Sequence, residues 1–188
     1  MVASEIQRKK IHPHKFTLWV AIGSIIMMFA GLTSAYIVKR EQPNWTSFEM
    51  PRLFWFSTAV MLISSLTIQW SLKSFKDREL GKYRTLTAVT LGLGIVFIVM
   101  QWIGFRQIWD SGFGLKGGAG AVQFLYIIFG LHALHVAGGI VALGLMFVRG
   151  FNRRYRTYSP VPVEIAATYW HFVDLLWVYL FVFFLWIQ

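Results

Sequence analysis

The sequence predicts an all-α integral membrane protein with five transmembrane helices, an inside N-terminus and an outside C-terminus. Of the 188 residues, 56% are hydrophobic and only 14% are charged, whereas soluble domains carry about 25% charged residues. Five long segments are almost free of charge, and the lysines and arginines gather in the short segments between them. No linker is long enough to separate domains, so we expect a single membrane domain over residues 1–188.

Each uncharged segment is long enough to cross a bilayer, because about 20 apolar residues at 1.5 Å each span a hydrocarbon core of about 30 Å. The first four contain no Asp, Glu, Lys or Arg, and the fifth contains one acid, Asp174. The first segment exceeds the hydrophobic core of a cleavable signal peptide, so we expect it to stay in the membrane. The predicted spans are residues 16–38, 53–72, 85–105, 122–148 and 168–187.

The basic residues predict the orientation of these spans. With the N-terminus inside, 13 lysines and arginines fall inside and 5 fall outside, and the more basic segments of a membrane protein stay in the cytoplasm. Topology therefore explains the net charge of +10, and we expect no binding of nucleic acid. The chain has no cysteine, which excludes disulfides and thiolate-bound metals.

Tryptophans mark the predicted ends of the spans. Indole rings concentrate at the membrane surface because their apolar body lies in lipid while the N–H reaches the headgroups. Trp177 instead lies near the middle of the last span, so we expect it to pack inside the bundle. The predicted inner ends carry Trp19, Trp70 and Trp170, and the outer ends carry Trp55, Trp102 and Trp186.

Asp174 is the only acidic residue within a predicted span. A charge at the centre of a membrane helix costs roughly 2.5–3.5 kcal/mol, so such a residue normally faces the bundle and has a partner. His171 precedes it by three residues and lies on the same helical face. We expect the two side chains to neutralise each other or to bind a neighbouring helix.

His132 and His135 form a second pair with the same spacing, in the fourth span. Haem ligation needs imidazoles at similar depth on facing helices, and His135 lies much deeper than His171. Carboxylate-bridged iron needs several acids and soft zinc sites need cysteine, so hydrogen bonding between helices is the favoured interpretation. Three glutamines near span ends are expected to reach water or headgroups: Gln69, Gln101 and Gln123.

Small residues four apart predict close contacts between helices. This spacing occurs at Gly31 and Ala35 in the first span, and at Gly138 and Ala142 in the fourth.

The last span carries a recognisable motif. Residues 169–177 read YWHFVDLLW, which resembles the signature with which subunit III of cytochrome c oxidase, and of its quinol-oxidase relatives, begins its final helix. The paired-histidine segment at 130–136, followed by Gly139, and the FAGLTSAY segment at 29–36 are also similar to the family. Glu164 stands where the family has a glutamate before the last helix.

This resemblance implies a short, five-helix bacterial subunit III in the plasma membrane. It would be a non-redox accessory subunit of a haem–copper terminal oxidase that reduces O₂ to water and pumps protons. The resemblance places haem and copper in partner subunits, and implies bound phospholipid and a role in proton uptake and turnover stability. The implied partners are catalytic subunit I, subunit II, small subunits and a larger respiratory supercomplex.

Two intramembrane carboxylates of the family are absent, because Ile25 and Gly104 occupy the aligned positions. The remaining candidates for proton uptake or for helix packing are Glu164, Trp170, His171, Asp174, His132 and His135. Two alternative functions are a quinol-oxidase subunit III and a stand-alone haem-binding protein or transporter. A transporter usually shows charged or broken helices near the middle of the membrane, and four of these spans have neither acid nor base.

Overall fold

The computed structural model describes residues 13–41, 50–110, 120–151 and 160–187, and within these ranges it contains five α-helices and no strand. Every helix is long and apolar enough to cross a membrane, which confirms the predicted all-α fold with five spans. The helices are α1 (Pro13–Arg40), α2 (Leu53–Lys76), α3 (Leu80–Asp110), α4 (Gly120–Phe151) and α5 (Val161–Ile187).

Each predicted span lies inside one helix, but the helices continue beyond it. The largest extension at a single end is in α5, which begins at Val161 and not at residue 168. Hydropathy marks only the part of a helix that lies in hydrocarbon, whereas the backbone hydrogen bonds of the helix continue into polar sequence. The added segment of α5, about two turns long, carries Glu164.

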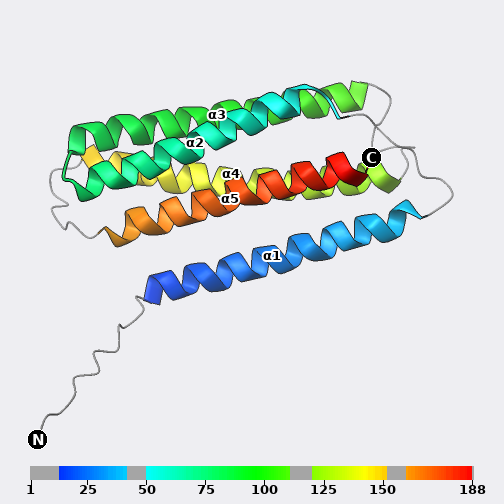
Figure 1. Cartoon of the computed structure of the whole chain (residues 1–188), viewed down its shortest axis with the longest axis horizontal. Helices are drawn as coiled ribbons and strands as arrows, with labels where there is room; N and C mark the ends of the chain where they lie inside the picture. Colours follow the sequence, from blue (N-terminus) through cyan, green and yellow to red (C-terminus); the bar gives the residue numbers. More distant parts are fainter. Residues whose placement is uncertain (1–12, 42–49, 111–119, 152–159, 188) are drawn as a thin grey trace, which may run out of the picture.

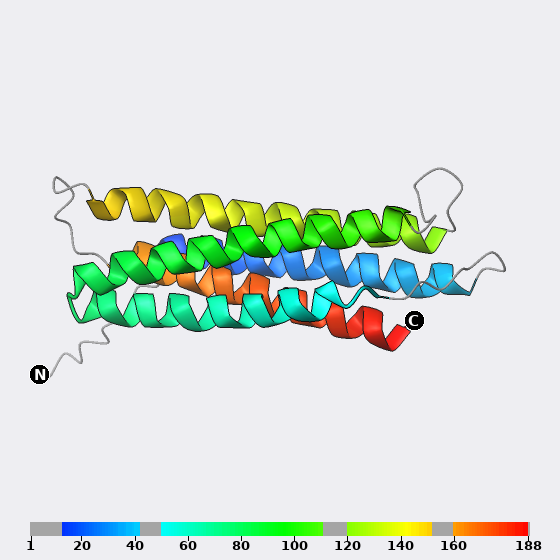
Figure 2. The same ribbon diagram turned by 90° about the horizontal axis from the view of Figure 1, so that it is seen from above.

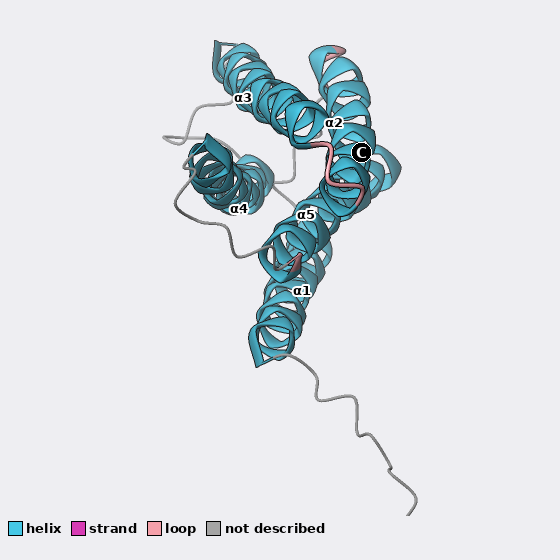
Figure 3. Ribbon diagram, turned by 90° about the vertical axis from the view of Figure 1, so that its left-hand side faces the viewer, coloured by secondary structure: helices cyan, strands magenta, loops and turns pink. Residues whose placement is uncertain are grey.

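Successive helices run in opposite directions and form one elongated bundle (Figure 1). α5 packs against α1, α2 and α4, and α2 forms its most extensive contacts with α3 (Figure 2). Among the five described helices, α1 touches α4 and α5 and no other, and it lies at the edge of the bundle (Figure 3). The start of α1, the end of α2 and the start of α5 lie at one end, which we call the Glu164 end.

A tight turn of residues 77–79 joins α2 to α3 at this end. The backbone N–H of Glu79 donates to the Ser74 carbonyl at 2.9 Å, and the N–H of Asp77 donates to the Lys73 carbonyl at 2.9 Å. Arg78 closes the turn with φ of 61°, a left-handed conformation that costs an L-residue roughly 1–2 kcal/mol. The turn holds α2 and α3 antiparallel and side by side.

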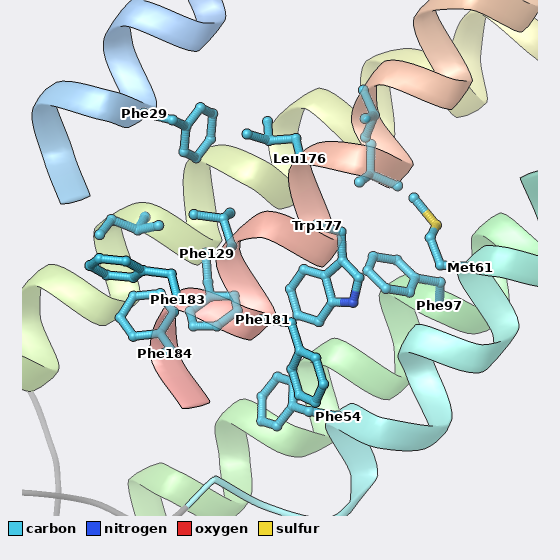
Figure 4. Close-up of a cluster of buried hydrophobic side chains, with 14 of the residues drawn as sticks. Phe29, Phe54, Met61, Phe97, Phe129, Leu176, Trp177, Phe181, Phe183 and Phe184 are labelled. Carbon is cyan, nitrogen blue, oxygen red and sulfur yellow. The ribbon is translucent and has the colours of Figure 1, made fainter. Parts of the chain in front are cut away.

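An aromatic cluster around Trp177 fills the core (Figure 4). Trp177 is fully buried, which confirms the prediction for this residue. Its ring lies edge-on to Phe97 at 5.1 Å between centroids and 5.3 Å from Phe129. Such offset and edge contacts are the arrangements that aromatic rings favour, and here they join α3, α4 and α5.

Hydroxyl groups form the α2–α3 contact. Thr67 and Thr90 share a hydrogen bond of 2.8 Å between their hydroxyls, and Ser71 and Thr87 share another of 2.8 Å. Small hydroxyl residues allow two membrane helices to approach closely and to hydrogen-bond across the contact.

Candidate functional site

The polar groups of the last-helix motif meet α2. Nδ1 of His171 lies 2.6 Å from the Ser65 hydroxyl, and its Nε2 lies 3.1 Å from Oε1 of Gln69. His171 therefore connects α5 to α2 with both ring nitrogens. This agrees with the expectation that the histidine binds a neighbouring helix.

Asp174 is buried one turn further along α5 and makes no such contact. The Ser65 hydroxyl is the polar group that faces it, but this hydroxyl bonds His171, and neither carboxyl oxygen has a hydrogen-bond partner among the described residues. Of the two alternatives expected for this pair, His171 therefore binds the neighbouring helix and does not pair with Asp174. α2 offers the imidazole two polar side chains at its own depth, so the ring turns toward α2 and away from the acid.

Trp170 is fully buried, so its predicted place in the surface belt is wrong. Its indole N–H donates to the Ser64 hydroxyl at 3.0 Å. The ring lies between two glycines of neighbouring helices: a Cβ atom at Gly94 would come within 2.8 Å of the ring, and one at Gly139 within 3.0 Å. Only glycine leaves room for the indole at these two positions.

The two histidines of α4 contact aromatic rings. His132 is buried and stacks on Trp177 at 5.2 Å, and neither ring nitrogen has a hydrogen-bond partner among the described residues. Nδ1 of His135 lies 2.7 Å from the carbonyl oxygen of Leu131, one turn earlier in the same helix. The hydrogen bond of this pair to another described helix is made by the backbone carbonyl of His135, which accepts from the Tyr169 hydroxyl of α5 at 3.1 Å.

Glu164 joins three helices at one end of the bundle. Its two carboxylate oxygens lie 2.7 Å from Nζ of Lys15 in α1 and 2.9 Å from Nζ of Lys76 in α2. The glutamate side chain is only 23% exposed, so the pairs are partly sheltered from water. This ion cluster ties α1 to α2 and α5.

The two glycines predicted to bring helices together are not points of close approach within this chain. Gly31 and Gly138 lie on exposed faces, and a Cβ atom at Gly31 would meet no other atom within 4 Å. Ala35 and Ala142 are half-buried. The close approaches occur instead at Gly94 and Gly139, where the bulky partner is a tryptophan from α5.

Gln101 is buried, although its place near a span end predicted access to water. Its amide nitrogen donates to the Ser57 hydroxyl at 2.9 Å, and its Oε1 has no partner in the described part of the chain. One turn further, a Cβ atom at Gly104 would lie 3.0 Å from the ring of Phe54. Phe54 thus occupies the space into which a carboxylate side chain at position 104 would extend.

The serines of α2 were not predicted as contacts from the sequence. Ser57, Ser64 and Ser71 are buried and accept or share hydrogen bonds from three different side chains. Their spacing of seven residues places them along one side of a helix. This repeat is the sequence signal that identifies the polar face of α2.

The geometry defines a class of protein: a helical membrane bundle with an aromatic core and a polar contact between α2 and α5. Among the described residues, no three His, Asp or Glu side chains are grouped so that they could hold a metal ion. Residues 14–188 match the cytochrome c oxidase subunit III family, and the chain belongs to this family. It is accordingly an accessory subunit of a haem–copper oxidase complex.

Curated relatives cover most of the chain. The cytochrome c oxidase subunit 3 of Bacillus sp. (strain PS3) is 28% identical over 168 residues, which are 87% of this chain and 80% of the relative. A probable cytochrome c oxidase subunit 3 of Nocardia farcinica is 29% identical over 92% of this chain and 90% of its own length. The subunit 3 of Oryctolagus cuniculus is 31% identical over 73% of this chain, and the match covers 50% of that longer protein.

Proposed function

We propose that the chain is the third subunit of a bacterial cytochrome c oxidase and packs in the plasma membrane against subunits I and II, without haem or copper of its own. The observation that carries this proposal is the family match across all five helices. The relatives above are named for the cytochrome c enzyme, which favours cytochrome c over quinol as the electron donor.

The proposed contribution of the subunit is to stabilise turnover and support proton uptake by the catalytic subunit, with phospholipid bound against its apolar faces. Long exposed apolar side chains cover the outer surface of the bundle, among them Met27 of α1 and Leu134 of α4. Such an apolar surface is suited to contact with lipid acyl chains or with the helices of a partner subunit. Small subunits and a larger respiratory assembly complete the proposed set of partners.

We also propose that the Glu164 end faces the cytoplasm. Most basic side chains in the described ranges lie there, whereas the opposite end has fewer, and positive charge is retained on the cytoplasmic side of a membrane. The basic residues at this end are Lys15, Lys73, Lys76, Arg78, Lys82 and Arg84.

Co-purification tests the proposal. An affinity tag on this chain in its native membrane should recover a haem-bearing catalytic subunit and a copper-bearing second subunit in equal amounts, with an untagged strain as the control. The isolated chain, separated from those subunits, should show no reduced-minus-oxidised haem spectrum and no stoichiometric copper or iron. Metal that stays with the isolated chain, or purification without any oxidase subunit, would contradict the proposal.

A further inference from the structure

Asp174 is enclosed by the bundle and lies far from any lysine. Only 4% of its surface is exposed, and it lies on the side of α5 that packs against α2. Ten residues separate it from Glu164, which at 1.5 Å per residue is about 15 Å along the helix. Lys15 and Lys76 pair with that glutamate, so neither lysine is placed to neutralise a charge on Asp174.

The surrounding helices bring no other charge to this acid. The predicted spans within α1, α2 and α3 contain no Asp, Glu, Lys, Arg or His. In α4, the ring of His135 lies against Phe29 of α1, on another side of α5, and His132 stacks on Trp177 one turn further along α5. Neither histidine bonds Asp174, because neither carboxyl oxygen has a hydrogen-bond partner among the described residues.

The hydrogen bonds of His171 decide what the nearby Ser65 hydroxyl can offer. Oε1 of Gln69 can only accept, so Nε2 of His171 carries the hydrogen of the 3.1 Å contact. This imidazole is neutral, since it pairs with no acid and an imidazolium would add a second unpaired charge within the span. Its Nδ1 therefore accepts the hydrogen of Ser65 at 2.6 Å. The serine oxygen that faces Asp174 is left with lone pairs and no hydrogen to donate.

We infer that Asp174 carries a proton in the folded subunit and is a neutral acid at neutral pH. A carboxylate at this place would face the lone pairs of Ser65 and would have no donor in the described part of the chain. A buried carboxyl group in such surroundings takes up a proton, because an ionised group without partners is far more costly to bury. α5 then crosses the membrane with no acidic or basic charge from Ile165 to Ile187. The inference concerns this chain alone and does not depend on the proposed function.

Infrared spectroscopy of the purified full chain in phospholipid vesicles tests this assignment, because a protonated carboxyl group has a carbonyl stretching band that a carboxylate lacks. The chain has three aspartates, and the other two, Asp77 and Asp110, are exposed. At about pH 7 an exposed aspartate is ionised, since its ordinary pKa is about 3.9. Isotope labelling of the aspartate carboxyl carbon shifts the band and assigns it to aspartate without any mutation.

We expect one label-sensitive carboxyl band per chain at neutral pH. Asp174→Asn should remove this band, whereas Asp110→Asn, the matched control, should keep it at full intensity. In the assembled oxidase, the difference between the spectra of the wild type and the Asp174→Asn variant should contain the same single band. A labelled wild-type chain without the band would overturn the inference, since all three aspartates would then be ionised. A band that persists at full intensity in Asp174→Asn would overturn it as well.

Discussion

Trp170 and Asp174 lie one turn apart on α5 and are held in different ways. The indole fills a space that two glycines leave open and donates its N–H to Ser64. The acid is equally enclosed, yet its oxygens have no hydrogen-bond partner among the described residues. A buried carboxyl group that no hydrogen bond among the described residues links to the surface is poorly suited to collecting protons. We therefore propose that Asp174 packs in the core and does not supply protons.

The Asp174→Asn variant separates the two roles. Asparagine has the same shape and removes no hydrogen bond, so we expect normal assembly and unchanged oxidase turnover from neutral to alkaline pH. Asp174→Leu should also assemble, because an apolar side chain of similar size avoids burying an unpaired polar group. The measurement is turnover against pH, normalised to subunit content. A fully assembled Asn variant that loses rate at high pH, where protons are scarce, would show that the acid supplies protons.

At the scale of the elements, α1 depends on few contacts. Of the other described helices it packs against α4 and α5 alone. Its contacts with α5 include a Thr33–Tyr179 hydroxyl contact of 3.0 Å and an edge contact between the Tyr36 and Phe184 rings at 5.1 Å. At the Glu164 end, Lys15 pairs with the glutamate. The ion cluster is therefore the contact that sets the position of the start of α1 relative to α2 and α5.

Removing the charge of Glu164 should loosen α1. We expect Glu164→Gln to lower the stability of the assembled subunit by about 0.5–2 kcal/mol, since two partly sheltered ion pairs are lost and isolated surface pairs contribute 0.2–1 kcal/mol each. The measurement is the temperature at which the subunit dissociates from the oxidase, at low and at high salt. Glu79→Gln is the control, because Glu79, in the turn just before α3, pairs locally with Lys82 of α3 at 2.8 Å. Equal shifts for both variants would contradict a role in joining helices.

At the scale of the whole molecule, an odd number of spans places the two termini on opposite sides of the membrane. The basic residues predict a cytoplasmic N-terminus. Reporter fusions after the second and fourth helices should be active as cytoplasmic markers, and fusions after the first, third and fifth as external markers. A cytoplasmic reporter at the C-terminus would refute this topology, and a complete inversion of the pattern would leave the five-helix count intact while refuting the orientation.

The sequence by itself determined the number and approximate place of the helices and the motif of the last one. Length and hydropathy are local properties, and a segment of about 20 apolar residues meets the one requirement that a bilayer imposes on a span. The burial of Trp177 was also predictable, because an indole far from both membrane surfaces has no headgroup to reach. The motif of residues 169–177 was sufficient to indicate the family that residues 14–188 match.

Only the tertiary structure decided which side of each helix faces its neighbours. A helix that is apolar on all sides has no polar face that shows how it is rotated about its axis. Residue spacing therefore suggested Gly31 and Gly138 as helix contacts, whereas the close approaches in the bundle are at Gly94 and Gly139. The same rotation buries Trp170 and directs His171 toward Ser65 and away from Asp174. These choices depend on the side chains of other helices, which lie far away in the sequence and meet only after the bundle has packed.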